Sequence, residues 1–334
     1  MEKRIKERFN DTILREAAGR YGVAVERVEL LDGFESFIFQ FRRGAGEYIL
    51  RLSHSLRRSE GLIRGEVDWI NYLAAGGASV AAAIPSADGN LVECIDDGRG
   101  GQFLTTAFVK AQGRMLRREE WRPPLVERYG QLLGRMHALT KTYEPADPAW
   151  RRIHWDDPEM LYVEQFLPPD QTTVRDRYRA LMAHLDGLPR DGREAYGLIH
   201  QDAHAGNLFV DEAGRITLFD FDDCTYSWFA NDVAIVLFYA VMWEQDPAAF
   251  TAAFMSDFLR GYRRENRLDP RWLAEIPHFL KLREIDLYAV IYRSFDVENL
   301  DDPWCAGYMK GRRERIEAGQ PYVTFDFETL APHL

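Results

Sequence analysis

The segment of residues 198–222 constrains the fold of this chain more than any other part of the sequence. Its first two residues are apolar and predict a short buried strand that leads into a polar loop, residues 200–206, and functional side chains favour such loops. Two apolar runs follow, residues 208–210 and 216–219, with a turn that contains Gly214 between them. Short apolar runs on both sides of a glycine turn predict a β-hairpin.

The register of this hairpin decides which polar residues meet at its open end. With a two-residue loop at residues 213–214, residue 208 pairs with residue 219 and Asn207 lies opposite Asp220. Directly opposed side chains are about 5 Å apart at Cβ. Mg²⁺ prefers oxygen ligands and leaves most of its positions to water and phosphates. The segment therefore predicts a magnesium site with Asn207 and Asp220 as ligands.

Asp202 precedes Asn207 by five residues. This is the spacing of the kinase catalytic loop, in which the aspartate accepts the proton of the acceptor hydroxyl. Phosphoryl transfer needs little covalent help from a protein, because most of the work is positioning and charge neutralisation. One base, two metal ligands and a cation for the phosphates meet most of this requirement. We therefore predict a kinase with Asp202 as the base.

The polar residues of this segment resemble the aminoglycoside phosphotransferase and choline kinase-like family, which is related to the protein kinases. The resemblance is carried by His200, Asp202, His204, Asn207, Asp220 and Asp222. It implies a two-lobe, protein-kinase-like α+β fold, with a small antiparallel β-sheet and one main helix in the N-lobe and a larger, mostly helical C-lobe. It also implies Mg²⁺ and ATP as cofactors, with GTP as an open alternative to ATP.

The same resemblance implies roles for neighbouring polar residues. His200 would brace the catalytic loop, and Asp232 would hydrogen-bond that loop from the next helix, with an ordinary N-cap as the alternative. His204 would lie near the acceptor, with loop packing as the alternative. Asp222, where protein kinases have glycine, would support a second metal ion or orient the acceptor. Asp223 is a further candidate for the acceptor site.

The N-terminal part of the chain switches from a helical pattern to an alternating one. A helix is predicted first and three antiparallel strands after it, at residues 5–21, 25–31, 37–41 and 48–52. The connection after the first strand, residues 32–36, lies where kinases cover the phosphates of the nucleotide. Gly33 and Ser36 are therefore candidate phosphate contacts, and a plain hairpin turn is the alternative.

The third strand contains Arg51, where kinases usually have the lysine that contacts the α- and β-phosphates. Arginine keeps the charge, but its planar fork differs in geometry from an ammonium group. Glu66 follows fifteen residues later, on a predicted helix at residues 62–74. We predict an ion pair between Arg51 and Glu66 like the one in kinases, and a solvated glutamate is the alternative.

Further strands at residues 80–84, 91–95 and 102–109 complete a predicted antiparallel sheet of five or six strands. Residues 110–113 form the linker, which divides the chain into a nucleotide-binding N-lobe, residues 1–109, and a catalytic C-lobe, residues 110–334. The family resemblance implies that the backbone at the end of the last strand holds the adenine edge, at Thr106, Ala107 and Phe108.

The remainder of the chain is predicted to be mainly helical. The predicted helices are residues 124–139, a helix that begins near Trp228, and residues 247–264, 270–293 and 303–319. His137 is predicted to be a packing residue rather than a ligand. Tyr288 and Tyr292 belong to an aromatic stripe at helical spacing, which is typical of a core, and they are also candidates for the acceptor site.

Composition excludes several other classes of protein. The first residues are charged and contain no apolar core of a signal peptide, and the longest apolar run, residues 233–243, is too short to cross a bilayer. Three scattered cysteines argue against a disulfide framework or a zinc knuckle. A net charge of −11 argues against nucleic acid as a partner. We therefore predict a cytoplasmic protein without membrane or nucleic-acid partners, and the sequence predicts no oligomeric state.

Two other activities remain as alternatives. A metal-dependent hydrolase could use His200, Asp202 and His204, but it would leave Asn207 and the N-terminal half unexplained. An atypical Ser/Thr protein kinase would share the fold, but the A-P-E element is missing and residues 220–229 leave no room for a long activation loop. We therefore predict a small hydroxyl acceptor, which is an amino alcohol, a homoserine-like amino acid, a sugar or an aminoglycoside.

Overall fold

The structure is a computed structural model that describes residues 2–31, 33–190 and 192–334. Asp32, in the predicted phosphate-covering connection, lies outside the described residues. The chain forms two compact units. The first unit contains Met1–Met115, Tyr143–Arg152 and Asn207–Asp222, and the second contains Leu116–Thr142, Ile153–Gly206 and Asp223–Leu334. These packing units are discontinuous in sequence, whereas the predicted lobes, residues 1–109 and 110–334, are continuous. The division of nucleotide binding and catalysis between these two lobes remains a proposal.

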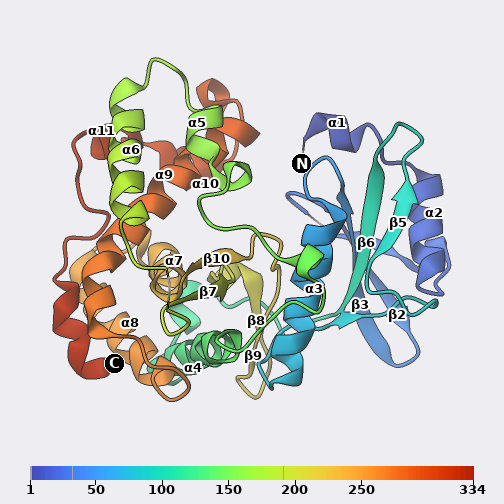
Figure 1. Ribbon diagram of the computed structural model, residues 1–334, viewed down its shortest axis with the longest axis horizontal. Helices are drawn as coiled ribbons and strands as arrows, with labels where there is room; N and C mark the ends of the chain where they lie inside the picture. The colour runs from blue at the N-terminus through green and yellow to red at the C-terminus, as the bar shows by residue number, and fades with distance from the viewer. Residues whose placement is uncertain (1, 32, 191) are drawn as a thin grey trace. The chain divides into compact units, whose positions relative to one another are not determined.

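The first unit is built on an antiparallel six-stranded sheet (Figure 1). Its strands are β1 (Glu29–Leu31), β2 (Phe37–Arg43), β3 (Gly46–His54), β4 (Ala83–Ile84), β5 (Glu93–Asp96) and β6 (Gln102–Val109). The order is β1-β2-β3-β6-β4, and β5 also pairs with β6. This confirms the predicted sheet of five or six strands. Residues 25–27 of the predicted first strand instead form a 3₁₀ turn.

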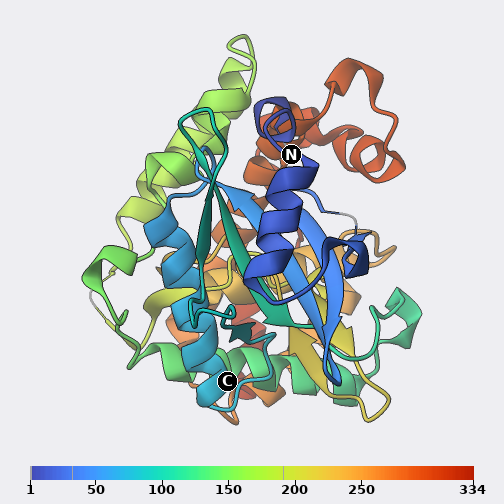
Figure 2. The same cartoon turned by 90° about the vertical axis from the view of Figure 1, so that its right-hand side faces the viewer.

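The predicted first helix is interrupted. It forms α1 (Lys3–Lys6) and α2 (Asp11–Arg20), because the side chain of Asn10 caps α2 by accepting the N–H groups of Thr12 and Ile13. Figure 2 shows α2, in dark blue, lying across one face of the sheet. The core beneath it joins the apolar face of α2 to the inward side chains of the strands, among them Ile13, Ala17, Phe39, Leu50 and Phe103.

The helix α3 (Glu60–Ala75) also belongs to the first unit. Ser59 caps it by accepting the N–H of Leu62. Its Gly65 lies against the segment 143–152, because a Cβ at this position would be 1.9 Å from the carbonyl oxygen of Trp150. The glycine therefore allows this distant segment to pack directly on the helix.

The hairpin of β8 (Leu208–Val210) and β9 (Ile216–Leu218) is joined to the first unit along both edges. Val80 pairs with Leu218 in a parallel bridge, and Arg114 pairs with Val210 in an antiparallel bridge. The predicted strand at residues 80–84 is therefore divided between two partners. Its first residues bind the hairpin, and only β4 joins the large sheet.

The second unit is mainly helical. Its helices are α4 (Pro123–Thr140), α5 (Tyr162–Phe166), α6 (Thr172–Asp186), α7 (Phe229–Val241), α8 (Pro247–Tyr262), α9 (Ile276–Ser294), α10 (Pro303–Met309) and α11 (Arg312–Glu317). Glycines allow α4 and α8 to touch, because a Cβ at Gly130 would lie 1.9 Å from the carbonyl oxygen of Phe258, and one at Gly261 would lie 1.8 Å from that of Glu127.

Two predicted helices of this unit begin or end differently. Residues 270–275 form the 3₁₀ helix η6 (Pro270–Glu275) before α9 begins. The predicted helix at residues 303–319 is divided at Lys310 and Gly311, and Gly311 has a φ of 65° that helical residues do not adopt. The helices α5 and α6 and the short strand β10 (Thr225–Trp228) were not predicted. Among the described residues, no helix is long and apolar enough to cross a membrane.

Candidate active site

The polar loop at residues 200–206 follows a buried strand, as the sequence predicts. This strand, β7 (Tyr196–Ile199), pairs antiparallel with β10 in the second unit. The Asp232 carboxylate, on the first turn of α7, accepts the N–H groups of His200 and Gln201, both at 2.9 Å. The same carboxylate lies 3.1 Å from Nε2 of His137, so the predicted packing histidine is buried behind it. Asp232 therefore holds the start of the loop by its backbone.

Asp202 lies between two basic side chains of the second unit. One carboxylate oxygen forms an ion pair with Arg283 of α9, and the other lies 3.3 Å from Nε2 of His204. Nδ1 of His204 accepts the N–H of Gly206 at 2.9 Å, so a neutral His204 carries its proton on Nε2, towards Asp202. Burial alone would raise the pKa of Asp202, but His204 and Arg283 hold it well below its usual range. Asp202 is therefore ionised at neutral pH.

Arg283 and Tyr239 were not predicted as site residues. The Arg283 guanidinium donates to the Tyr239 hydroxyl at 2.5 Å, and the Tyr239 ring lies 4.4 Å from the His204 ring. Asp223 is within electrostatic reach of both, and it contributes to a raised pKa of Arg283. The structure thus brings Asp202, His204 and Asp223 together around this pair. No local pattern in the sequence marks Arg283, because it lies 81 residues from Asp202.

The register predicted for the hairpin was wrong by one residue. Leu208 pairs with Leu218, and the carbonyl of Asn207 accepts the N–H of Phe219 at 2.9 Å. Asn207 therefore lies opposite Phe219, and Asp220 lies one residue beyond this pair. Asn207 is buried and Asp220 is exposed to solvent.

The shift arises in the turn, which is one residue longer than the predicted loop. Asp211 pairs with Arg215, because its N–H donates to the Arg215 carbonyl at 3.1 Å and its carboxylate accepts the Arg215 N–H at 2.9 Å. Gly214 has a φ of 73°, the left-handed conformation that a three-residue hairpin loop requires. The side chain of Asp211 was the signal for this longer turn.

Asp222 lies among arginines of the first unit. Its carboxylate forms an ion pair with Arg57 and lies 3.8 Å from Nε of Arg58. Burial would raise the pKa of Asp222, but Arg57 and Arg58 hold it well below its usual range. Within the described part of the chain, its Oδ1 is buried and has no hydrogen-bond partner. A buried, ionised oxygen of this kind fits a divalent cation, as do the oxygen donors of Asn207 and Asp220.

The predicted ion pair between Arg51 and Glu66 is present. Two parallel hydrogen bonds of 2.7 Å join the guanidinium to the carboxylate, and both side chains are buried. Burial would lower the pKa of Arg51, but Glu66 outweighs it and raises that pKa. The Arg51 guanidinium also lies over the Phe108 ring, 5.0 Å from its centre. Contact of Arg51 with a nucleotide stays a prediction.

The other nucleotide candidates lie within the sheet or beside it. Ser36 is buried, with its hydroxyl 3.0 Å from that of Ser53, and Gly33 allows the loop to turn tightly, because a Cβ there would be 2.4 Å from the Ser36 carbonyl oxygen. Thr106, Ala107 and Phe108 pair with β3, and the last two also pair with β4. Their backbone groups thus face neighbouring strands, which weighs against the predicted backbone contacts with adenine.

Tyr288 and Tyr292 form hydrogen bonds with Gln171 rather than with the residues around Asp202. The Tyr288 hydroxyl donates to Oε1 of Gln171 at 3.1 Å, and Nε2 of Gln171 donates to the Tyr292 hydroxyl at 2.7 Å. Tyr288 is only 2% exposed. This favours the core stripe over an acceptor contact for Tyr288. Asp286, on the same helix, was not predicted, and burial raises its pKa to about 7.

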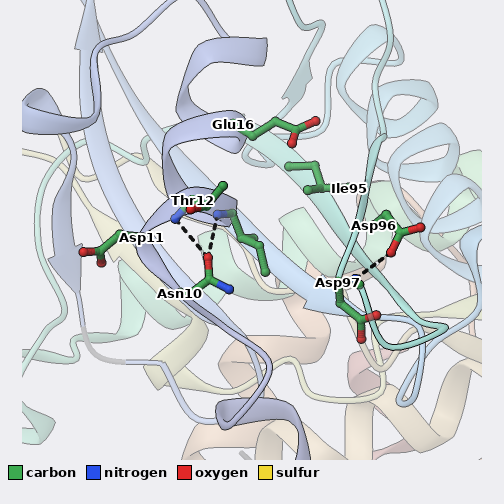
Figure 3. Close-up of a pocket in the computed structure, with 9 residues that line it drawn as sticks. Asn10, Asp11, Thr12, Glu16, Ile95, Asp96 and Asp97 are labelled. Atoms are coloured by element: carbon green, nitrogen blue, oxygen red, sulfur yellow. Dashed lines mark hydrogen bonds between the residues drawn. The ribbon is translucent and has the colours of Figure 1, made fainter.

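One hollow of the first unit lies away from every predicted site residue. It has a volume of about 670 Å³ and is lined by residues of α2 and of the turn after β5 (Figure 3). Its polar groups serve local structure, because Asn10 caps α2 and the Asp96 carboxylate accepts the N–H of Gly98 at 2.6 Å. We assign this hollow no part in the active site.

Comparison with known proteins places these residues in a family. A sequence model of the phosphotransferase enzyme family matches residues 27–276. The amicoumacin kinase of Bacillus subtilis (strain 168) is 40% identical over 335 aligned positions, which cover 99% of this chain and 99% of that protein. The match therefore includes both units of the chain.

Solved structures give the same result. The amicoumacin kinase hAmiN in complex with AMP-PNP, Ca²⁺ and Ami has a TM-score of 0.93 and 40% identity, covering 99% of this chain and 100% of that chain. A microcompartment-associated aminopropanol kinase has a TM-score of 0.72 at 21% identity, covering 93% and 98%. A spectinomycin phosphotransferase has a TM-score of 0.58 at 16% identity, covering 97% and 98%. These last two share the fold.

These similarities confirm the predicted two-lobe, protein-kinase-like α+β fold and do not favour the hydrolase or the protein kinase. The matched regions include the loop of Asp202 and the hairpin that carries Asp220. The chain therefore belongs to the phosphotransferase enzyme family and is a kinase that acts on hydroxyl groups of small molecules.

Proposed function

We propose that this kinase transfers the γ-phosphoryl group of ATP to a hydroxyl group of amicoumacin or of a closely related molecule. The observation that carries the proposal is the 40% identity to an amicoumacin kinase along 99% of both proteins. A solved relative of equal identity contains AMP-PNP, Ca²⁺ and Ami together. ATP and a divalent cation are therefore the proposed cofactors, with Mg²⁺ as the physiological ion and GTP as the alternative donor.

Asp202 is the proposed base. Its carboxylate is ionised at neutral pH, because His204 and Arg283 lower its pKa, and it can accept the proton of an acceptor hydroxyl. A base with such a low pKa takes the proton late, when the hydroxyl oxygen already bonds to phosphorus. This agrees with a loose transition state, in which positioning matters more than early deprotonation. His200 and Asp232 are proposed to position Asp202 through the loop backbone.

Asn207, Asp220 and Asp222 are the proposed ligands of the divalent cation. When bound, the cation would neutralise the charge of the transferring phosphoryl group. Asp222 fits this role through its buried Oδ1, which has no hydrogen-bond partner among the described residues, while its ion pair with Arg57 fixes the position of the other oxygen. Arg57 and Arg58 add positive charge beside these carboxylates. His204 and Asp223 are proposed to contact the acceptor.

Arg51 is proposed to bind the α- and β-phosphates while Glu66 orients it. The bidentate pair fixes the plane of the guanidinium, so the direction of its remaining N–H groups is set in advance. Gly33 and Ser36 are proposed to contact the phosphates from the neighbouring loop. Residues 1–109 would bind the nucleotide and residues 110–334 would bind the acceptor, and we propose that the protein works in the cytoplasm.

A panel of acceptors tests this proposal. The purified protein is incubated with ATP and Mg²⁺ and with amicoumacin, spectinomycin, aminopropanol or homoserine, and the products are analysed by mass spectrometry. We expect the mass of one added phosphoryl group on amicoumacin, and a much higher kcat/KM for it than for the other acceptors. AMP-PNP in place of ATP is the control without transfer. Phosphorylation of another acceptor with amicoumacin untouched would overturn the assignment of the substrate.

A further inference from the structure

Three metal-ligating side chains converge in the second unit where α6 ends and α9 begins. His184 lies in the last turn of α6, Glu275 is the last residue of η6, and His278 lies in the first turn of α9. Nε2 of His184 is 2.7 Å from Oε2 of Glu275, and Nδ1 of His278 is 3.1 Å from the same oxygen. One ligand atom from each residue lies within 4.8 Å of the other two.

This spacing matches the coordination sphere of a small divalent metal ion. Zinc binds imidazole nitrogen and carboxylate oxygen at about 2.0–2.2 Å in tetrahedral geometry, so its ligand atoms are roughly 3.3–3.5 Å apart. The separations of 2.7 and 3.1 Å in the structure would widen by about 0.2–0.8 Å. Two imidazoles and one carboxylate also leave a fourth position for water. The residues are therefore placed for coordination without a change of the fold.

The contacts within the cluster favour a metal ion as well. The two imidazole rings are stacked with centres 4.0 Å apart. In the described chain, Nδ1 of His278 is buried and contacts the Glu275 carboxylate without hydrogen-bond geometry. A cation between nitrogen and oxygen would satisfy both atoms.

We propose that His184, Glu275 and His278 form a binding site for a divalent transition metal ion, and that Zn²⁺ is the ion best matched to this ligand set. The site shares no residue with the phosphoryl-transfer machinery. The bound ion would tie the end of α6 to the start of α9, the helix that carries Arg283. Its role is therefore structural, because it fixes two helices of the second unit.

Equilibrium dialysis of the full chain against Zn²⁺ tests the proposal. The measurement is made in excess Mg²⁺ and repeated with the Asp220→Asn variant. Zinc bound at the proposed phosphoryl-transfer site is thereby excluded from the binding stoichiometry. We expect one bound zinc ion per chain in both proteins. His184→Gln and His278→Gln should each lower the zinc affinity at least tenfold. His333→Gln removes an imidazole near the C-terminus and should leave the affinity unchanged.

A second measurement needs no variant at this site. Diethyl pyrocarbonate modifies accessible imidazoles, and mass spectrometry locates the products. We expect zinc to protect His184 and His278 of the wild-type chain and to leave His333 reactive. The proposal is overturned if no zinc binds in excess Mg²⁺, if the variants at His184 and His278 bind zinc as tightly as His333→Gln does, or if zinc fails to protect the two histidines.

Discussion

Two arginine–carboxylate pairs, one in each unit, differ in how completely they are enclosed. The side chains of Arg51 and Glu66 in the first unit are 6% and 0% exposed, and two hydrogen bonds join them. The side chains of Arg283 and Asp202 in the second unit are 16% and 21% exposed, and one guanidinium nitrogen contacts one carboxylate oxygen. The geometry of the first pair is therefore fixed by its two hydrogen bonds. The second leaves its carboxylate partly exposed to solvent.

This difference predicts which residue carries the chemistry. Asp202→Asn keeps the size of the side chain but removes the charge that accepts a proton, so we expect kcat to fall by about 10²–10⁴-fold. Nucleotide affinity, measured by fluorescence titration, should change by less than about threefold, because the proposed nucleotide contacts lie elsewhere. Activity within tenfold of the wild type would contradict the assignment of Asp202 as the base.

Breaking the enclosed pair should act mainly on stability. Glu66→Ala leaves the charge of Arg51 buried without its partner, and we expect the free energy of unfolding to fall by ~3–5 kcal/mol in urea titrations. Glu60→Ala on the same helix is the matched control, because its ion pair with Arg64 is partly exposed to solvent, with side chains 44% and 29% exposed, and should contribute less than ~1 kcal/mol. Equal losses in the two variants would show that enclosure is not what distinguishes Arg51 and Glu66.

The partly buried carboxyl group of Asp286 interacts electrostatically with Arg283 of the second pair, and its contribution to stability depends on pH. Burial raises the pKa of Asp286 to about 7, so this residue stabilises the fold below pH ~4 and that contribution is lost as pH rises towards 7. Asp286→Asn should therefore gain stability relative to the wild type over this interval, by at most ~4 kcal/mol. Urea titrations between pH 4 and 8 measure the difference, with the exposed Asp301→Asn as control. Parallel pH profiles of Asp286→Asn and the wild type would contradict the raised pKa.

The smallest expected effect concerns Arg283 itself. Arg283→Met keeps the length of the side chain but removes one of the charges that lower the pKa of Asp202. The acid limb of the pH profile of kcat/KM should therefore move to higher pH, while the rate near pH 7.5 changes by less than about tenfold. Tyr239→Phe is the control, because it removes a hydrogen bond of Arg283 and leaves the ion pair intact. An acid limb that does not move would show that Arg283 has no influence on the base.

The sequence predicted the parts of this molecule that depend on local patterns. The strands around residues 37–54, the buried strand before His200 and the pair of Arg51 with Glu66 all follow from periodicity and from the order of elements along the chain. The interruption of the first helix could also have been predicted, because asparagine, the residue type at Asn10, commonly caps helices. Its effect was missed because the apolar spacing continued through it.

The features that were not predicted depend on contacts between residues far apart in the sequence or on one additional residue in a turn. Arg283 lies 81 residues from Asp202 and Arg57 lies 165 residues from Asp222, so no spacing rule could connect them. The hairpin register depended on whether Asp211 pairs with Arg215, and a difference of one residue moved Asp220 out of line with Asn207. Packing, rather than composition, therefore determined the charges around both aspartates.

Gln201 and Asp220 are the two non-glycine residues in the described chain with φ in the left-handed region, at 69° and 64°. Such a conformation costs about 1–3 kcal/mol at a residue with a Cβ, and glycine would adopt it freely. Folding alone would therefore favour glycine at both positions as sequences drift. A side chain at both positions therefore costs stability in this segment, and the proposed role of Asp220 as a metal ligand would account for that cost at its position.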